Sequence, residues 1–187
     1  MSIDLLAAAG EHYATVLTQA TPAQWTQPSP CQEWTVGDVA DHVTGGNRWS
    51  VLVLAGQEPG PALQQVVSSG LGVDRPAEYP ASQQAQLAAF TAESDPSRTV
   101  NHLVGPVSVS RFVQMRVLDL TVHAWDLARG IGADETLPDP LVQACLRQLE
   151  GMGPLVALSG RFGPGAENAG PAATDQERML HLSGRRP

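Results

Sequence analysis

The sequence predicts an all-α protein, because apolar residues recur at helical spacing along most of the chain and the one alternating stretch is short. With 187 residues, the chain has the length of one compact domain, and we expect a single domain spanning residues 1–187. Hydrophobic residues make up 42% of the chain, which is enough to fill a core. A chain of this size need not depend on a disulfide or a metal for its stability.

The N-terminal part is predicted to form two helices, over residues 2–19 and 36–55. In the first helix, apolar residues recur every three or four positions. The segment 21–34 contains three prolines and indicates a connection with a short helical turn. Thr35 and Asp38 then form a pattern typical of a capping box, which starts the second helix.

Two adjacent glycines, Gly45 and Gly46, lie inside the second predicted helix. Each should weaken the helix by roughly 1 kcal/mol relative to alanine. Such glycines often mark the close approach of another element or a ligand, although the chain is rich in glycine throughout.

The middle of the chain has a weaker pattern. Residues 56–77 are rich in glycine and proline and are predicted to form a long connection with a helical turn at 62–68. A third helix is predicted over residues 81–93. Residues 98–107 alternate weakly, which predicts a short strand or hairpin.

The strongest helical pattern covers residues 110–128, and Gly130 follows where a helix-terminating glycine belongs. A further helix is predicted over residues 138–157, with a proline near its start. The chain is then rich in glycine and proline from residue 160, until a last short helix over residues 175–182.

Composition and charge exclude several classes of function. The net charge is −8, and the eleven basic residues, all arginines, form no cluster that would bind nucleic acid or an anionic membrane surface. No run of eighteen apolar residues could span a bilayer, and we find no signal peptide. Cys31 and Cys145 are too few and too distant for a disulfide framework. We therefore expect a cytoplasmic protein with reduced thiols.

Asp119 and His123 are four residues apart in the strongest predicted helix, so their Cβ atoms should lie roughly 5–6 Å apart on one face. Two such groups can share one metal ion. Asp126 falls on the same face, either as an additional ligand or as an acceptor that fixes a histidine tautomer. His42, in the second predicted helix, is the candidate third ligand. On spacing alone, a solvated helix face and a hydrogen-bonded core histidine explain these residues better than a metal does.

Two separated segments add to this pattern: CQEWTVGDVADHV at residues 31–43 and VLDLTVHAWDLAR at residues 117–129. They resemble the two motifs of the mycothiol-dependent maleylpyruvate isomerase N-terminal-like family, a branch of the DinB/YfiT-like superfamily. The closing QERMLHLSGR at residues 176–185 resembles the C-terminal end of a short actinobacterial subfamily of metal-binding proteins.

The resemblance implies a DinB/YfiT-like four-helix bundle with extra short helices and a small hairpin. In that family, a histidine of the second helix and a carboxylate-x-x-x-histidine pair of the fourth helix hold a divalent metal. The resemblance thus assigns the metal to His42, Asp119 and His123. Asp119 stands where the isomerases have glutamate, so its carboxylate must lie nearer the helix axis. We also expect the chain to lack the separate C-terminal domain of the isomerases, so their substrate does not carry over.

Two histidines and one carboxylate suit zinc, and also nickel or iron. Three protein ligands leave one position open for water or a thiolate, as in catalytic zinc sites. The resemblance implies mycothiol as the thiol, so we expect a mycothiol-dependent transferase or isomerase whose metal activates the thiolate. The alternatives are a non-catalytic module that binds or senses metal or thiol, and a structural metal in a homodimer.

The remaining candidate residues are weaker. Cys31 precedes a helix start and is predicted to pack rather than to act as a ligand or redox thiol. The residues predicted to pack in the core are Cys145, Trp34, Trp49 and Trp125, the last of which could also wall the site. The residues predicted to be solvated or satisfied by ordinary partners are His12, His102, His181, Arg48 and Arg129, the two arginines being minor candidates for binding a substrate carboxylate.

Overall fold

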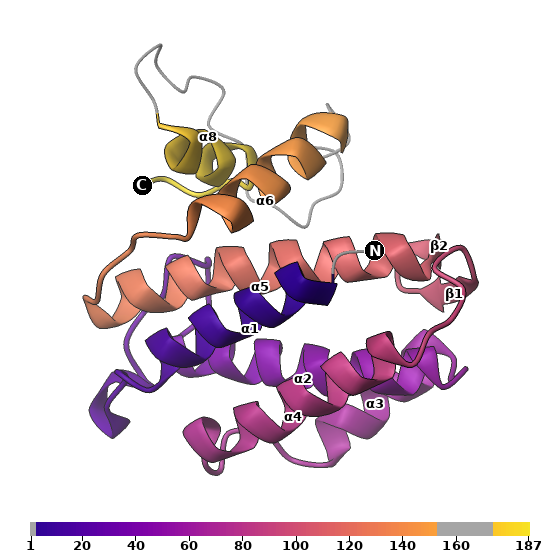
Figure 1. The fold of residues 1–187 in the computed structure, drawn as a ribbon. Helices are drawn as coiled ribbons and strands as arrows, with labels where there is room; N and C mark the ends of the chain where they lie inside the picture. Colours follow the sequence, from indigo (N-terminus) through magenta and orange to yellow (C-terminus); the bar gives the residue numbers. More distant parts are fainter. Residues whose placement is uncertain (1–2, 153–173) are drawn as a thin grey trace.

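The computed structural model describes residues 3–152 and 174–187. Four long helices pack side by side in a bundle, in which α1 and α2 each contact both α4 and α5 (Figure 1). The bounds of these helices are α1 Ile3–Leu17, α2 Val36–Leu54, α4 Arg75–Thr91 and α5 Val109–Ile131. The predicted all-α four-helix bundle is confirmed.

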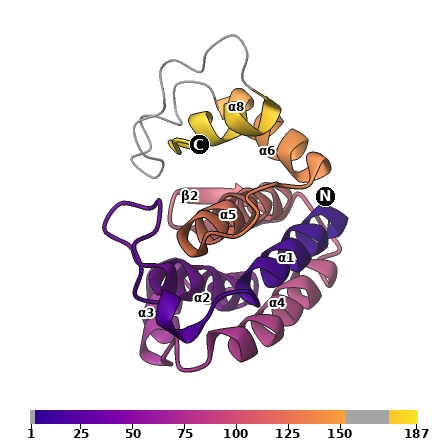
Figure 2. The same cartoon turned by 90° about the vertical axis from the view of Figure 1, so that its left-hand side faces the viewer.

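Shorter elements surround the bundle. Their bounds are η1 Pro22–Gln24, α3 Pro59–Ser68, β1 Thr99–His102, β2 Gly105–Ser108, α6 Asp139–Met152 and α8 Asp175–Leu182. The strands β1 and β2 form the predicted antiparallel hairpin, and α3 packs on α2. The helices α6 and α8 pack against each other, and α6 covers the side of α5 that faces away from α2 (Figure 2).

The helix α3 and the start of α4 lie in residues 56–77, whose glycines and prolines predict a connection. The prolines of this segment occupy the first turns of helices, Pro59 and Pro61 in α3 and Pro76 in α4. The first turn needs no backbone N–H for helical hydrogen bonds, so proline is tolerated there. The side chain of Asp74 caps α4 by accepting a backbone hydrogen bond. These prolines therefore start helices rather than prevent them.

The end of α5 corrects the prediction at Gly130. The helix continues through Gly130, and Gly132, with a φ of 72°, supplies the left-handed residue that ends it. A Cβ on Gly130 would lie 2.7 Å from Cγ2 of Val36. The glycine at 130 therefore permits the close approach of α5 to the start of α2.

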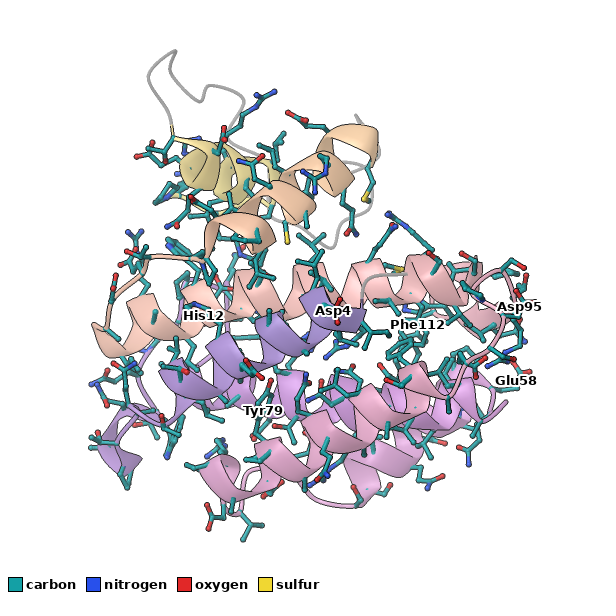
Figure 3. The ribbon with its side chains drawn as sticks, in the orientation of Figure 1. Asp4, His12, Glu58, Tyr79, Asp95 and Phe112 are labelled. Carbon is teal, nitrogen blue, oxygen red and sulfur yellow. The ribbon has the colours of Figure 1, made fainter. Side chains whose placement is uncertain are left out.

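Aromatic side chains fill much of the bundle interior. The rings of Phe90 and Phe112 pack edge to face with centroids 5.2 Å apart. The side chain of Tyr79 reaches from α4 toward α1, where its hydroxyl donates a hydrogen bond to the carbonyl oxygen of Gly10 at 3.0 Å (Figure 3). Burial of this apolar surface is the main favourable contribution to folding.

A buried polar network centres on Arg116 of α5, which is 6% exposed. Its Nε donates to Oε1 of Gln86 at 2.8 Å, and its Nη2 donates to Oδ1 of Asn47 at 2.8 Å. The network thus joins α5 to α4 and α2. A Cβ on Gly46 would lie 2.6 Å from Nη1 of Arg116, so the element that approaches closely at Gly46 is this guanidinium.

Among the residues described, no helix has both the length and the apolar character needed to cross a membrane. Two predicted features fall outside the described residues. They are the last residues of the helix predicted over 138–157, beyond Met152, and the glycine- and proline-rich segment from 160 to 173.

Candidate metal centre

Three potential metal ligands converge where α2 packs against α5. Oδ1 of Asp119 lies 3.2 Å from Nε2 of His42 and 3.5 Å from Nε2 of His123. The three ligand atoms all lie within 4.8 Å of one another. The structure therefore brings together the three residues predicted from sequence, and we call them the outer donor set.

Local sequence positions each member of the outer donor set. The hydroxyl of Thr35 accepts from the backbone N–H of Asp38 at 3.1 Å, and the carboxylate of Asp38 accepts from the N–H of Thr35 at 2.8 Å. This capping box fixes the start of α2, and His42 follows two turns later. Asp119 and His123 are four residues apart on α5, which places both side chains on the face that meets α2.

The outer donor set is reached from solvent on the side of His42. The side chain of His42 is 40% exposed, whereas that of His123 is only 10% exposed. The ring of half-buried Trp34 lies 4.9 Å from the ring of His42 and 6.1 Å from that of His123, measured between centroids. Trp34 therefore forms a wall of the site as well as packing on the core. The sequence predicted only the packing role. Trp125, the predicted candidate for a wall, is buried beneath Arg129.

Arg116 holds the second oxygen of the Asp119 carboxylate. Its Nη1 donates to Oδ2 at 2.6 Å, which leaves Oδ1 facing the two histidines. Burial by itself would raise the pKa of Asp119, but Arg116 and then His42 outweigh it, so the pKa lies well below its usual range. The carboxylate is therefore ionised at neutral pH and oriented for a cation.

A second carboxylate lies behind His123. The buried Asp126 has its Oδ2 at 2.9 Å from Nδ1 of His123, and Arg185 contacts both of its oxygens, with Nε at 3.1 Å and Nη2 at 2.7 Å. Burial would raise the pKa of Asp126, but these two hydrogen-bonding partners lower it to about 2. Asp126 is thus placed to accept a hydrogen bond from Nδ1–H of His123 in the tautomer that leaves the Nε2 lone pair free, which favours the predicted acceptor role over that of an additional ligand.

Cys31 joins this second cluster. It sits in the short loop that precedes α2, where Glu33 has a left-handed φ of 66°. Its thiol donates to Oδ2 of Asp126 at 3.2 Å. Burial and the Asp126 carboxylate raise the pKa of the Cys31 thiol to about 12, so it is protonated at neutral pH. Cys31 packs as predicted, but against site residues, whereas Cys145 is buried in the core as expected.

Sequence reasoning missed three residues around this site: Arg116 and Trp34 border the outer donor set, and Arg185 contacts Asp126 and Cys31 behind it. Arg116 precedes Asp119 by three residues on one helix, a spacing from which the contact was predictable. Trp34 lies within the first motif but on a loop, where no periodicity indicates which way a side chain points. Arg185 comes from the segment after α8, and no local pattern links it to α5.

The other sequence candidates lie outside this site. Arg48 pairs with Glu78 at 3.0 Å, and Arg129 pairs with Glu135 at 2.8 Å, so both arginines have ordinary partners, as predicted. The remaining histidines are on other elements: His12 on α1, His102 on β1 and His181 on α8.

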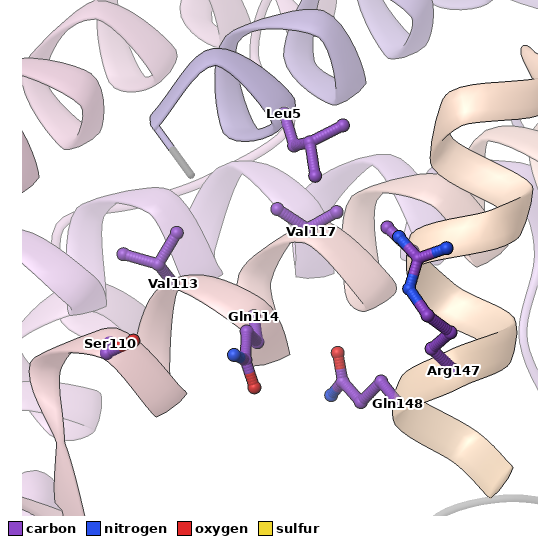
Figure 4. A pocket seen from close by; sticks show the side chains of 8 residues that line it. Leu5, Ser110, Val113, Gln114, Val117, Arg147 and Gln148 are labelled. Atoms are coloured by element: carbon purple, nitrogen blue, oxygen red, sulfur yellow. The ribbon is translucent and has the colours of Figure 1, made fainter. Parts of the chain in front are cut away.

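A separate groove of about 390 Å³ opens between α1, α5 and α6 (Figure 4). No member of the outer donor set lines it. Its lining residues are Leu5, Ser110, Val113, Gln114, Val117, Ala144, Arg147 and Gln148.

Sequence comparison identifies relatives of the chain. The profile of the mycothiol maleylpyruvate isomerase N-terminal domain matches residues 6–128, a stretch that contains the outer donor set but not Arg185. Two uncharacterized proteins from two strains of Mycobacterium tuberculosis are each 34% identical to the chain over 140 residues. That alignment covers 71% of this chain and 68% of each relative.

Two solved structures share the fold. One is the crystal structure of the mycothiol-dependent maleylpyruvate isomerase, with a TM-score of 0.61 and 20% sequence identity. The other is a histidine-to-alanine variant of the isomerase, with a TM-score of 0.65 and 19% identity. Each match covers 79% of this chain and 67% of the other chain. At these sequence identities the similarity demonstrates a common fold, and the function has to be argued from the residues of the site.

Proposed function

Because the chain belongs to the mycothiol maleylpyruvate isomerase N-terminal domain family, we propose that it binds one divalent metal through His42, Asp119 and His123 and uses it in mycothiol-dependent chemistry. Zinc is the metal we expect, and nickel and iron also suit two imidazoles and a carboxylate. The observation that carries the proposal is the convergence of these ligand atoms, within 4.8 Å of one another, from two helices that pack together.

The surroundings of the outer donor set fit a cation. Arg116 takes one oxygen of Asp119 and leaves the other directed at the histidines. Asp126 lies on the Nδ1 side of His123, so that the lone pair of Nε2 faces Asp119. With Nε2 unprotonated on both rings, each member of the set would offer one lone pair toward a common point, as a metal site requires.

The protein residues have distinct roles in this proposal. His42, Asp119 and His123 would hold the metal, while Trp34 shields the two rings on one side. The exposed side of His42 provides access for a small molecule. A divalent metal in this position would lower the pKa of a thiol that binds it, so that the nucleophilic thiolate exists at neutral pH.

We propose mycothiol as the thiol and a transferase or isomerase reaction as the activity. Family membership supports this choice, because the family takes its description from a mycothiol maleylpyruvate isomerase. The test is to load the protein with cobalt and titrate mycothiol into it. We expect a thiolate-to-cobalt charge-transfer band that saturates with mycothiol.

The Cys31→Ser variant is the control for this titration, because it removes the thiol of the protein that lies nearest the site. The band should persist in Cys31→Ser if mycothiol supplies the sulfur. The absence of a band with mycothiol, and with any other small thiol, would refute the thiol mechanism.

One observation favours a second function, that of a non-catalytic module that binds or senses metal or thiol. A catalysed reaction would need a group that moves a proton, and the candidate is Asp126, beside His123. It is fully buried and paired with Arg185, and its pKa of about 2 makes it a poor base at neutral pH. A module without turnover would show the mycothiol band described above but no product with electrophilic substrates.

Replacing Asp126 with asparagine should weaken zinc binding by roughly 10–100-fold, the range expected when a metal-binding histidine loses its hydrogen-bond partner. The asparagine fits the same space but no longer offers two anionic oxygens to His123 and Arg185. Competition with a chromophoric chelator measures the affinity. If Asp126→Asn loses essentially all metal, Asp126 is a direct ligand and the acceptor role is wrong.

Removing the metal with a chelator should leave the helical circular dichroism signal largely unchanged. The bundle buries its own aromatic and aliphatic core, and the outer donor set lies at the edge of that core. The spectrum is recorded before and after chelation, with zinc added back as a control for reversibility. Collapse of the helical signal would instead mean that the metal is structural.

A further inference from the structure

A second set of potential ligands lies on the other side of His123. Sγ of Cys31, Nδ1 of His123 and Oδ2 of Asp126 lie within 4.8 Å of one another, and we call these residues the inner donor set. The individual distances are 3.9 Å from Sγ to Nδ1, 3.2 Å from Sγ to Oδ2 and 2.9 Å from Nδ1 to Oδ2. A thiolate, an imidazole and a carboxylate are all established ligands of zinc and cobalt.

The two donor sets share His123 but use different nitrogens of its ring. Nε2 faces the outer donor set, at 3.5 Å from Asp119, and Nδ1 faces the inner donor set. A cation in the inner donor set would need the lone pair of Nδ1. The tautomer in which Nδ1–H donates a hydrogen bond to Asp126 excludes such a cation, so the choice of tautomer and the choice of metal position are linked.

A cation already contacts the inner donor set, and it is the guanidinium of Arg185. Its Nη2 donates to Oδ2 of Asp126 at 2.7 Å and lies 3.5 Å from Sγ of Cys31. Its Nε donates to the other oxygen of Asp126 at 3.1 Å, and its Nη1 donates to the carbonyl oxygen of Ser183 at 2.8 Å. Arg185 thus contacts two members of the inner donor set, and its hydrogen bond to the backbone of Ser183 holds the guanidinium in place.

We propose that Arg185 is a specificity-determining residue, whose guanidinium excludes divalent metal from the inner donor set and thereby confines the metal to the outer donor set. This proposal rests on the proposed function in one respect, namely that a divalent metal binds to the outer donor set.

Three physical facts support this role. Asp126 is fully buried, and a buried carboxylate must be paired with a cation or a set of donors. Arginine keeps its charge at all accessible pH values and binds a carboxylate in a two-pronged geometry. A second cation placed beside it would experience like-charge repulsion that solvent screens only weakly at a buried site. Without Arg185, the same buried anion becomes an attractive position for a metal.

The experiment compares cobalt spectra of the full chain in the absence of any added thiol. The variants are Arg185→Gln, Arg185→Lys, Arg186→Gln and the double variant Cys31→Ser/Arg185→Gln. Arg186 is the matched control, because it is the adjacent arginine, it is exposed, and its substitution changes the net charge equally. Circular dichroism and thermal melting of the same samples verify that each variant is folded.

We expect the unchanged chain and Arg186→Gln to bind cobalt without a thiolate-to-cobalt band. Arg185→Gln should gain such a band, and the additional Cys31→Ser substitution should abolish it. Arg185→Lys keeps a positive charge beside Asp126 and should resemble the unchanged chain. This pattern would identify the charge of Arg185, rather than the packing of its segment, as the excluding feature.

Two results would overturn the proposal. The first is a folded Arg185→Gln protein that binds cobalt with no thiolate band. The second is a thiolate-to-cobalt band in the unchanged chain that the single variant Cys31→Ser abolishes, since it would place metal in the inner donor set despite Arg185. Failure of the proposed function is distinct, because it appears as unchanged cobalt binding in His42→Ala, a residue that the inner donor set does not contain.

Discussion

His42→Ala and His123→Ala are each expected to bind zinc more than about 100-fold more weakly than the unchanged chain. This loss of affinity exceeds the loss expected when a metal ligand keeps its place but loses its hydrogen-bond partner. Each substitution removes one of three ligand atoms and leaves two, which is too few to hold the metal against water. The metal content of each protein after dialysis against buffered zinc measures the loss. The affinity follows from competition with a chelator.

His12→Ala is the matched control, because it removes a histidine from α1, away from both donor sets. It should retain the metal content of the unchanged chain. Full metal content in both His42→Ala and His123→Ala would contradict the assignment of the outer donor set. Loss in His123→Ala alone would instead point to the inner donor set.

Arg116→Met should lower the free energy of unfolding by about 3 kcal/mol, the lower end of the range for breaking a buried ion pair by removing one partner. Methionine keeps much of the length of the side chain but none of its donors. The side chains of Asn47 and Gln86, both fully buried, would lose the hydrogen bonds that Arg116 donates, and Asp119 would lose its charged partner. A buried polar group that loses its hydrogen-bond partner lowers the stability of the folded protein by most of the free energy needed to remove that group from water.

Urea denaturation of the metal-free proteins measures this change. Arg111→Met on the same helix is the control, because the side chain of Arg111 donates a hydrogen bond to Gln114 at a position exposed to solvent. Its effect should stay within about 0.5 kcal/mol, as for most surface substitutions. A change of similar size in Arg116→Met and Arg111→Met would show that the polar network contributes little to the bundle.

The helices were largely predictable because their apolar spacing is local information. The short helix predicted over residues 175–182 has those bounds in the structure, and the hairpin after residue 98 is present. The errors arose where a residue type has two structural uses. Pro59 and Pro76 start helices in a segment that proline content predicts to be a connection. Gly130 serves a close approach to Val36, although its position suggested a helix end.

The candidate site was predictable to the extent that helix geometry dictates it. The four-residue spacing of Asp119 and His123 places them on one face, and family resemblance supplied His42 from a second helix. The positions of Cys31 and Trp34 were not predictable, because a loop with a left-handed residue at Glu33 sets their direction.

The contact of Arg185 with Asp126 joins residues 59 positions apart in the chain. It depends on how α6 and α8 return across α5, a tertiary arrangement that no local pattern contains. Long-range ion pairs of this kind are therefore visible only once the fold is known.

The most direct test of the central claim is a crystal structure of the zinc-loaded full chain, with the metal located by its anomalous scattering. We predict one peak, bonded to Nε2 of His42, Nε2 of His123 and one oxygen of Asp119, with a non-protein ligand completing the coordination. Arg185 should remain paired with Asp126. A peak beside Cys31 and Asp126, or the absence of a peak at the outer donor set, would contradict the account.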